Sequence, residues 1–490
     1  MTGNAGVWML VATAIVMTLS GLPAWLVLVT VSTLFGLGGL AFGVFTVQLV
    51  FALPARLLGL LEHDLLQALP LYVFVGALLN RLPLAEVLFR VANRVLRRTA
   101  AAPYLAGLGL GALLAPMNGS VGASVAMLAR AVQPRLDAQG VAPERGAALI
   151  CAASTIGVVV PPSLVLILLG DTMMRAHTEA VNATGEAVRI LNTQDIFHGA
   201  LLPAASMLLL FFFVTWWRNR APAAAAWSPP ATDAPEVQVS RGQWISAVCA
   251  VAGIVGLLTA VALGYLYAVE AAATGGLALL LFGLVTRSLT RPVLRLVLAD
   301  TLAISGALFA LLVAATMYTL FLRAFETDLW IGRVLQGLGG GGYTALTVVL
   351  LLLTLSAFVL DAFEITFAII PVVMPPLLKL VPDATWVAVL TLLVLQMSFL
   401  LPPFGYSVLM AGSVLRRRLA QRAMALSLLP YLLVQALVIL LVLAWPALVW
   451  HGTPAPAANA DGKPALSEEE VQKLFEQQRI KSEKNEEPAR

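Results

Sequence analysis

The stretch Pro116-Met117-Asn118-Gly119-Ser120-Val121-Gly122 decides how the chain folds, because it interrupts an apolar segment at residues 104–129. That segment is long enough to cross a bilayer, which takes roughly 17 to 25 mostly apolar residues. A proline, two glycines and a polar pair at its centre do not continue a helix comfortably. Basic residues flank both ends, namely Arg94, Arg97, Arg98, Arg130 and Arg135. Because basic ends favour the cytoplasm, we expect a re-entrant hairpin whose two ends lie on the same side.

The composition of the whole chain is that of a membrane protein. Of the 490 residues, 60% are hydrophobic and only 11% are charged, and the mean hydropathy is +0.91. A water-soluble domain of this length needs more polar residues to cover its surface. We therefore predict an all-α polytopic membrane protein. The pI of about 9.2 comes from short basic clusters between apolar runs, which are typical of cytoplasmic loops, and no nucleic-acid partner is expected.

Cysteine and histidine give no sign of a catalytic or metal centre. The two cysteines, Cys151 and Cys249, lie in separate apolar runs. The four histidines form no HExxH or other closely spaced ligand set. A membrane enzyme needs a nucleophile with a base or a metal set, so an enzyme is disfavoured and no cofactor is expected.

Apolar runs elsewhere in the chain predict ten crossings. Placing the basic clusters in the cytoplasm puts both termini outside, together with an acidic loop at residues 171–198. The Pro- and Ala-rich segment at 219–243 becomes a cytoplasmic linker, and the charged tail at 450–490 a solvated appendage. The ten predicted crossings are residues 7–19, 25–50, 66–82, 147–169, 200–217, 244–263, 265–285, 297–322, 384–414 and 425–449.

The same order of segments occurs on both sides of the linker, which predicts an inverted repeat. The first repeat, residues 1–218, holds the hairpin at 104–129 and a helix at 147–170 that is broken by a double proline. The second, residues 244–449, holds a hairpin at 343–378 and a broken helix at 384–414. Five crossings in each half are an odd number, so the second half lies upside down relative to the first. Inverted repeats with interrupted helices at the midplane are a signature of secondary transporters.

The four interruptions predict where ligands bind, because non-helical backbone at membrane depth must be buried in protein or line a wet cavity. Freed carbonyls suit a small cation, and half-helix N-termini suit a carboxylate. The predicted cation-binding residues are Asn118, Gly119, Ser120, Pro161, Ser163, Asp361, Pro402, Pro403 and Gly405. The predicted substrate-binding residues are Asn118, Ser120, Ser124, Ser163, Asp361 and Glu364.

The small polar residues Asn118, Ser120, Ser124 and Ser163, and the acid Asp361, also have a purely structural explanation. Small polar residues in membrane helices often only join one helix to another, which applies to each serine taken singly. Asp361 stands among apolar neighbours, so its ionised carboxylate needs a cation, a partner or a proton. A structural ion pair is the alternative for Asp361, although no Lys or Arg lies near it in sequence.

Four motifs together resemble the large permease subunit of tripartite ATP-independent periplasmic (TRAP) transporters, within the ion-transporter superfamily of elevator carriers. The resemblance covers residues 21–449. Two departures stand out: Asn118 replaces the usual serine in the first hairpin, and Leu401 replaces the usual threonine before Pro402. The motifs are the hairpin Asn118-Gly119-Ser120-Val121-Gly122-Ala123-Ser124, the run Gly157-Val158-Val159-Val160-Pro161-Pro162-Ser163, Glu270-Ala271-Ala272-Ala273 and Leu401-Pro402-Pro403-Phe404-Gly405.

The resemblance implies sodium-coupled uptake of a small organic acid across the bacterial inner membrane, with sodium ions bound at the interruptions. It also implies two partner chains: a small four-helix membrane subunit and a periplasmic solute-binding protein that captures the substrate. The alternative is a stand-alone carrier or cation/proton antiporter of the same superfamily, in which Asp361 titrates. The binding protein would largely set selectivity, so the substrate itself is not readable from this chain.

Overall fold

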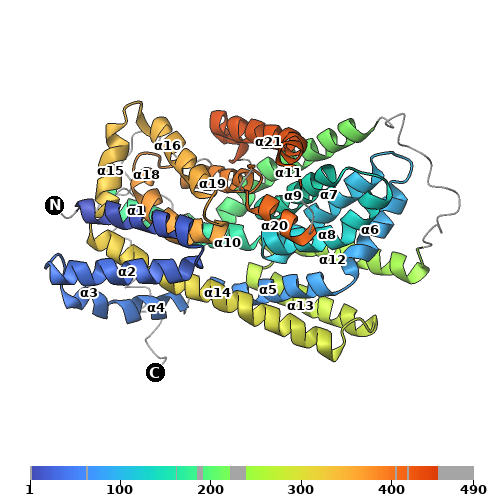
Figure 1. Cartoon of the computed structure of the whole chain (residues 1–490), viewed down its shortest axis with the longest axis horizontal. Helices are drawn as coiled ribbons and strands as arrows, with labels where there is room; N and C mark the ends of the chain where they lie inside the picture. The colour runs from blue at the N-terminus through green and yellow to red at the C-terminus, as the bar shows by residue number, and fades with distance from the viewer. Residues whose placement is uncertain are drawn as a thin grey trace, which may run out of the picture.

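The computed structural model describes residues 3–61, 64–161, 163–184, 191–220, 239–402, 405–415 and 419–450. Every regular element in these ranges is helical (Figure 1). The all-α fold class predicted from composition is therefore confirmed. Most of the predicted linker, the charged tail, Pro162 and Pro403 lie outside the described residues.

The first part of the chain ends with α11. Two of its neighbouring helix pairs are sharply bent, α5 and α6 by 63° and α9 and α10 by 41°. Its elements are α1 (Gly3–Ser20), α2 (Ala24–Ala41), α3 (Val47–Phe51), α4 (Leu53–Leu61), α5 (Asp64–Arg81), α6 (Leu84–Val95), α7 (Ala102–Leu114), η1 (Ala115–Asn118), α8 (Val121–Ala138), α9 (Pro143–Val159), α10 (Leu164–Thr184) and α11 (Thr193–Asn219).

The second part begins with α12 and presents a similar order of elements. A helical hairpin, α16 to α18, is followed by a pair with an irregular break, α19 and α20, and then by a single long helix. Its elements are α12 (Arg241–Ala262), α13 (Ala268–Val285), α14 (Arg291–Ala324), α15 (Thr327–Gly337), α16 (Gly341–Ser356), α17 (Ala362–Glu364), the π-helical turn η2 (Ile365–Ile369), α18 (Ile370–Leu378), α19 (Ala384–Ser398), α20 (Tyr406–Leu415), α21 (Gln421–Ala444) and η3 (Pro446–Leu448).

The helices agree with a polytopic membrane protein. Among the described residues, six helices are long and apolar enough to cross a bilayer alone: α2, α11, α12, α13, α14 and α21. The bent pairs α5–α6 and α9–α10 raise that number to eight. The remaining predicted crossings correspond to shorter apolar helices, α1 in one case and α19 followed by α20 in the other. The ten predicted crossings therefore require these shorter helices to be counted as well.

Two predicted boundaries were wrong. The crossing predicted at 25–50 ends at Ala41, because Gly43 takes a left-handed φ of 68° and closes the helix C-terminus. The outer loop predicted to begin at Asp171 is instead helical as far as Thr184, in α10. Asp171 pairs with Arg175 one turn later at 3.1 Å, and the face carrying Ala176 is buried. This one-turn ion pair and the burial support the extra turns.

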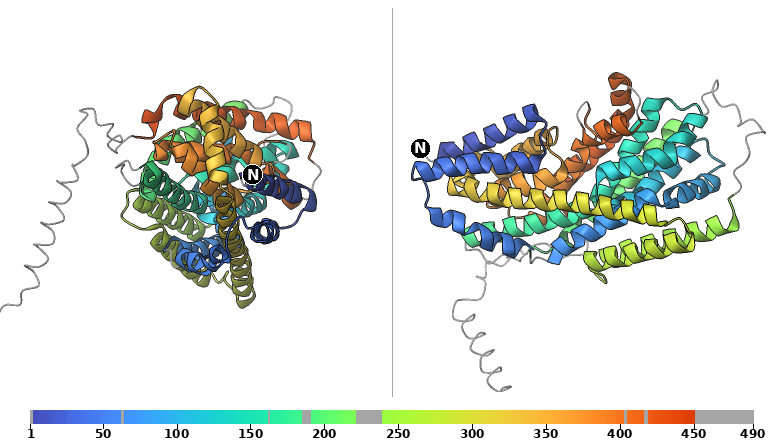
Figure 2. Two further views of the ribbon diagram at one scale, coloured as in Figure 1. Left: turned by 90° about the vertical axis from the view of Figure 1, so that its left-hand side faces the viewer. Right: turned by 60° about the horizontal axis from the view of Figure 1, so that its bottom comes forward.

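A long helix organises one side of the molecule. The 34-residue α14 packs against α2 and α5 and runs along most of the helical bundle (Figure 2). The helix α12, which packs against α6 and α13, buries only Ala247, Ile254 and Val261, seven residues apart, and exposes large apolar side chains elsewhere. Such continuous apolar exposure marks a surface that faces lipid or another membrane chain.

Near its C-terminal end, α14 is bonded to α10 and α18 through one arginine. The Arg323 guanidinium donates to Glu179 Oε2 in α10 at 2.6 Å and to the Pro371 carbonyl in α18 at 3.3 Å. One side chain therefore links α14 to both α10 and the second hairpin.

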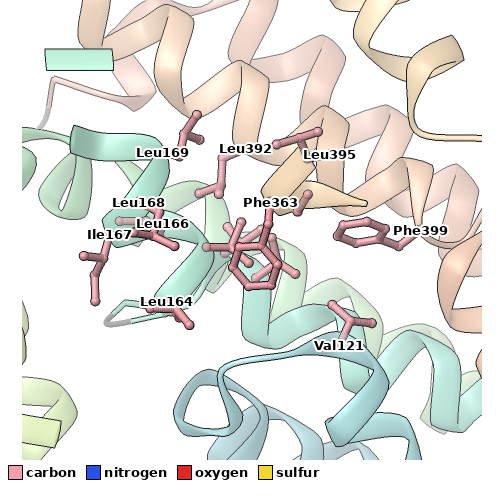
Figure 3. Close-up of a cluster of buried hydrophobic side chains, with 14 of the residues drawn as sticks. Val121, Leu164, Leu166, Ile167, Leu168, Leu169, Phe363, Leu392, Leu395 and Phe399 are labelled. Atoms are coloured by element: carbon pink, nitrogen blue, oxygen red, sulfur yellow. The ribbon is translucent and has the colours of Figure 1, made fainter. Parts of the chain in front are cut away.

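Hairpin and broken-helix segments meet at an apolar cluster (Figure 3). It contains Val121 at the start of α8, Phe363 in α17, and Phe399 directly after α19. Leu164 to Leu169 of α10 and Leu392 and Leu395 of α19 complete it. These side chains are buried. Their packing holds the polar residues of the interruptions in fixed relative positions.

Candidate functional site

The tip of the first hairpin turns over two residues. The 3-10 turn η1 ends at Asn118, Gly119 has a left-handed φ of 65°, and Ser120 is extended at the start of α8. Only glycine adopts the left-handed region freely, so Gly119 permits the reversal. The Ser120 side chain makes no capping bond to α8, whereas its carbonyl accepts from Ser124 Oγ at 3.0 Å.

Asn118 joins this tip to α5. Its Oδ1 lies 3.2 Å from Asn80 Nδ2, and its Nδ2 lies 3.2 Å from Ser124 Oγ. With the amide turned over, Asn118 donates to the Gly76 carbonyl and accepts from Ser124 N, both at 3.1 Å. Either orientation bridges α5 and α8. A Cβ on Gly76 would lie 2.5 Å from the Asn118 carbonyl oxygen, so glycine is needed for this close approach.

The break between α9 and α10 is held by Ser163. Its Oγ donates to the Val158 carbonyl at 2.7 Å and accepts from Leu166 N at 3.0 Å. It therefore satisfies one orphan group on each side of the interruption. Pro161 is buried beside it. This is the structural role that small polar residues were expected to have, and it leaves one lone pair on the hydroxyl oxygen.

A small cavity lies between the first hairpin tip and this break. Its volume is about 10 Å³, close to the minimum that holds one water-sized particle. Four predicted residues line it, namely Gly119, Ser120, Ser124 and Ser163. Ser154 of α9, which was not predicted, also lines it. The structure therefore brings these four predicted residues together.

The tip of the second hairpin carries Asp361 and Glu364 in a capping box. Asp361 Oδ1 accepts from Glu364 N at 2.8 Å, and Glu364 Oε2 accepts from Asp361 N at 2.9 Å. Asp361 is thus the N-cap of α17. Among the described residues, no Lys or Arg pairs with either carboxylate. The alternative of a structural ion pair is not observed in these ranges, and the capping box takes its place.

The second broken helix contains Pro402 and Gly405. Gly405 N donates to the Leu401 carbonyl at 2.7 Å, and a Cβ on Gly405 would lie 2.6 Å from the Phe399 carbonyl oxygen. The same Phe399 oxygen accepts from Ser407 Oγ at 2.6 Å. Backbone oxygens therefore crowd around Gly405, and only a residue without a side chain fits there.

A larger cavity of about 720 Å³ lies beside both hairpin tips. Its walls come from α5, α8, α14 and α20 as well as from the tips. The predicted residues that line it are Asn118, Gly119, Ser120 and Asp361. Gly119 and Ser120 also line the small cavity, so the two cavities share one wall. Ser124 and Ser163 line only the small one, and the Glu364 side chain bonds back to Asp361.

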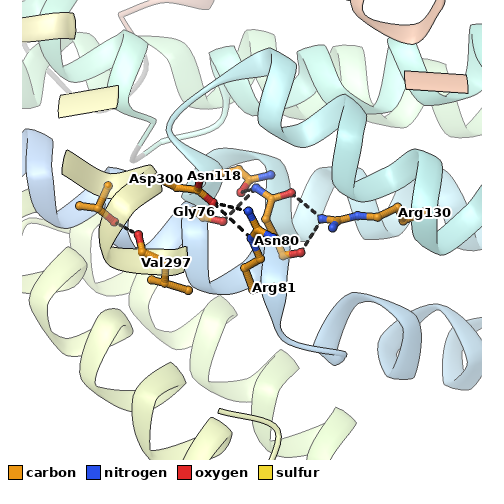
Figure 4. A network of polar contacts seen from close by, with 8 residues as sticks. Gly76, Asn80, Arg81, Asn118, Arg130, Val297 and Asp300 are labelled. Carbon is orange, nitrogen blue, oxygen red and sulfur yellow. Dashed lines mark hydrogen bonds and ion pairs between the residues drawn. The ribbon is translucent and has the colours of Figure 1, made fainter. Parts of the chain in front are cut away.

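Several polar residues of this cavity were not predicted. Tyr406 follows the Gly405 break directly, and its hydroxyl lies 3.0 Å from the position of a Cβ on Gly122. Asn80, Arg81, Arg130 and Asp300 form a polar network on the wall made by α5, α8 and α14 (Figure 4). In the sequence, Arg130 was considered only as a basic residue that flanks the hairpin, and Asn80 and Arg81 only as part of the crossing predicted at 66–82.

These hairpins, interruptions and cavities define the class of protein. The chain is an all-α polytopic membrane protein in which two hairpin tips lie beside two broken helix pairs, and interrupted helices of this kind are typical of secondary transporters. A comparison of folds agrees. The YdaH transporter from Alcanivorax borkumensis superposes with a TM-score of 0.59 at 17% identity, covering 83% of this chain and 90% of that one.

The chain belongs to the family of tripartite ATP-independent periplasmic transporters, DctM component, which matches residues 11–448. The C4-dicarboxylate TRAP transporter large permease protein DctM of Rhodobacter capsulatus is 22% identical over 395 residues, 79% of this chain and 86% of that protein. A putative TRAP transporter large permease protein of Haemophilus influenzae is 21% identical over 391 residues, covering 78% and 90%. The family suggested by the four motifs is therefore confirmed.

Proposed function

We propose that this chain is the membrane subunit that couples sodium influx to uptake of a small carboxylate in a three-component transporter of the bacterial inner membrane. The observation that carries the proposal is the shared wall at Gly119 and Ser120. On one side is a cavity of about 10 Å³, which suits a single small cation. On the other is a cavity of about 720 Å³, which has room for an organic acid.

The chemistry of the small cavity supports a cation. Ser124, Ser154 and Ser163 each donate their hydroxyl proton to a backbone carbonyl. A hydroxyl has one proton and two lone pairs. Ser163 Oγ also accepts from Leu166 N, and Ser124 Oγ lies 3.2 Å from Asn118 Nδ2, so each of the three oxygens retains at least one lone pair for a hard cation such as sodium. We propose Asn118, Gly119, Ser120, Pro161 and Ser163 as the parts of this first cation site, with Pro161 acting through the backbone that it interrupts.

The second hairpin supplies a carboxylate for a second cation. Asp361 lines the larger cavity without a basic partner among the described residues, and a carboxylate at membrane depth is costly unless it meets a cation. The turn at Pro402 and Gly405 adds carbonyl oxygens, and we include Pro403 from sequence alone. We propose that Asn118, Ser120, Ser124, Ser163, Asp361 and Glu364 hold the substrate directly or position the residues that do.

Two partner chains complete the proposal. A small four-helix membrane subunit would cover part of the apolar surface around α12, and a periplasmic solute-binding protein would deliver the acid. The names of the relatives from Rhodobacter capsulatus and Pseudomonas aeruginosa specify C4-dicarboxylates, so succinate is the first acid to test on this chain.

Reconstitution tests the proposal. Proteoliposomes containing this chain and its small subunit should take up labelled succinate or another small acid only when sodium is present outside and the binding protein is added. Each component is omitted in turn. Uptake without the binding protein would favour the stand-alone carrier. Proton-driven uptake without sodium would favour the antiporter-like alternative, which is supported by the lack of a basic partner for the Asp361 carboxylate among the described residues.

A further inference from the structure

Two arginines line the larger cavity, and their charges are balanced differently. Arg81 donates to Asp300 Oδ2 through Nε at 3.2 Å and through Nη2 at 2.7 Å, so α14 neutralises its charge. Arg130 makes no ion pair with any described residue. Its Nη2 donates to the Asn80 carbonyl and, at 3.0 Å, to Asn80 Oδ1 (Figure 4). The hydrogen-bond acceptors of Arg130 are thus neutral oxygens only, although the Glu86 carboxylate attracts its charge and the Arg81 guanidinium repels it.

The direction of Arg130 places this charge near the hairpin tip. Side chains of an α-helix tilt toward its N-terminus, and α8 begins at the tip with Val121. The same Asn80 amide that accepts from Arg130 also lies 3.2 Å from the Asn118 side-chain amide in either orientation of the latter. One residue, Asn80, therefore lies between the Arg130 guanidinium and the polar tip.

The guanidinium also keeps donors free. Both bonds to Asn80 use Nη2, so Nε and Nη1 make no hydrogen bond within the ranges that the structure describes. A guanidinium binds a carboxylate through two parallel N–H donors, and these charged bonds are about twice as strong as bonds to neutral acceptors. An incoming carboxylate can therefore use the free donors of Arg130, or replace Asn80 as its partner.

We propose that Arg130 is the residue that binds a carboxylate of the transported acid in the larger cavity, and that Asn80 holds the guanidinium in place while the cavity contains no anion. The inference rests on the proposed function and adds a specificity-determining residue to it. When the acid binds, the bonds to Asn80 are exchanged for bonds to the carboxylate. Asn80 then keeps only its contacts with the hairpin tip. Binding of the acid in the cavity therefore changes the hydrogen bonds of a residue that touches the hairpin.

Succinate binding to the purified full-length chain in lipid nanodiscs tests this inference. The dissociation constant is obtained from thermal shift titrations with sodium succinate at constant sodium and ionic strength. We expect Arg130→Gln to raise it by about tenfold or more, since a hydrogen bond to a charged group is lost. Arg130→Lys should recover only part of the affinity, because lysine lacks the two-donor geometry.

Arg135→Gln is the matched control, because it removes the same charge from the same helix and Arg135 does not line the cavity. Its affinity should stay within about twofold of wild type. Succinamide, which has no carboxylate, should bind wild type and Arg130→Gln alike. The unfolding temperature without ligand shows whether each variant is folded. If Arg130→Gln does not fold, Arg130→Lys is the variant that tests the inference.

Three outcomes would overturn the inference. Equal succinate affinity in wild type and Arg130→Gln would remove Arg130 from the site while leaving the carboxylate function intact. An equal loss in Arg135→Gln would assign the effect to general charge. If succinate does not bind the wild-type chain at all, a C4-dicarboxylate function fails, and this inference fails with it.

Discussion

At the residue scale, Ser120 separates a cation role from a structural one. Its carbonyl accepts from Ser124 Oγ, but its own side chain does not cap α8. Removing the hydroxyl therefore leaves the hairpin hydrogen bonds in place. Ser163 is a poorer probe, because its hydroxyl bridges the break between Val158 and Leu166 and its removal would leave orphan groups on both sides.

Ser120→Ala should raise the sodium concentration for half-maximal transport about three- to tenfold, since one oxygen ligand worth roughly 1 kcal/mol is lost. The measurement is sodium-dependent succinate uptake in proteoliposomes. Ser206→Ala is the control, because that hydroxyl donates to the Pro203 carbonyl in α11, away from both cavities. If Ser120→Ala lowers only expression and keeps the wild-type sodium response, the serine serves helix packing alone.

Asp361 combines two roles that a single substitution separates. Asparagine is as good an N-cap as aspartate, so Asp361→Asn keeps the bond to Glu364 N and removes the charge. We expect sodium-dependent uptake to be abolished while the unfolding free energy changes by less than about 1 kcal/mol. Glu364→Gln keeps the reciprocal bond to Asp361 N and serves as the matched variant. A sodium dependence like that of wild type in Asp361→Asn would exclude Asp361 as a coupling residue.

At the scale of elements, glycines set the distance between the first hairpin and the first broken helix. A Cβ on Gly157 of α9 would lie 2.4 Å from the Ala115 carbonyl carbon, and one on Gly111 of α7 would lie 2.6 Å from the Ala153 carbonyl oxygen. The obstructing atoms are backbone, so they cannot move aside alone. These contacts hold the tip against the break and thereby form the small cavity.

Gly157→Ala should therefore destabilise the folded chain by about 1–3 kcal/mol, the usual cost of overpacking a tight contact. The protein is heated in detergent, and size-exclusion chromatography then measures the fraction that is still folded, which gives an unfolding temperature. Gly253→Ala on α12 is the control, because no atom lies within 4 Å of its added Cβ. An unchanged unfolding temperature for Gly157→Ala would mean that the hairpin and the broken helix are not closely packed in the native protein.

The sequence predicted the interruptions better than the residues around them. Proline and glycine act locally, so the turn at Asn118-Gly119-Ser120 and the break before Ser163 could be read from the chain. Asp361 and Glu364 stand three residues apart, as a capping box requires, but the structural alternative stated for Asp361 was an ion pair and not this cap. Asn80, Arg130 and Tyr406 reach the cavity only through the packing of α5, α8 and α20, which no local pattern encodes.

At the scale of the whole molecule, the inverted repeat remains a prediction about sides of the membrane. With basic clusters inside, Ala183 near the end of α10 is predicted to face the exterior of the cell. Its side chain is exposed, so a cysteine there can react with a reagent. Thr232 and Arg417, which lie outside the described residues, are predicted to be cytoplasmic. The tail beyond residue 451, also outside the described residues, is predicted to face the exterior.

Single cysteines at these positions, introduced after Cys151 and Cys249 are replaced, test this topology. An impermeant thiol reagent added to intact spheroplasts should label Ala183→Cys and a cysteine in the tail, but not Thr232→Cys or Arg417→Cys. Permeabilised cells, in which all four should react, are the control. Labelling of Thr232→Cys from outside, or opposite sides for Ala183→Cys and the tail, would mean that the two halves are not inverted copies.

The central claim is that this molecule couples sodium to a carboxylate through two cavities that share one wall. Parallel measurement of labelled sodium and labelled succinate influx, in proteoliposomes that contain all three components, tests it most directly. We predict that each influx requires the other and that both fall together in Asp361→Asn. Succinate influx that persists at full rate when choline replaces sodium, or sodium influx that is independent of succinate, would contradict the account.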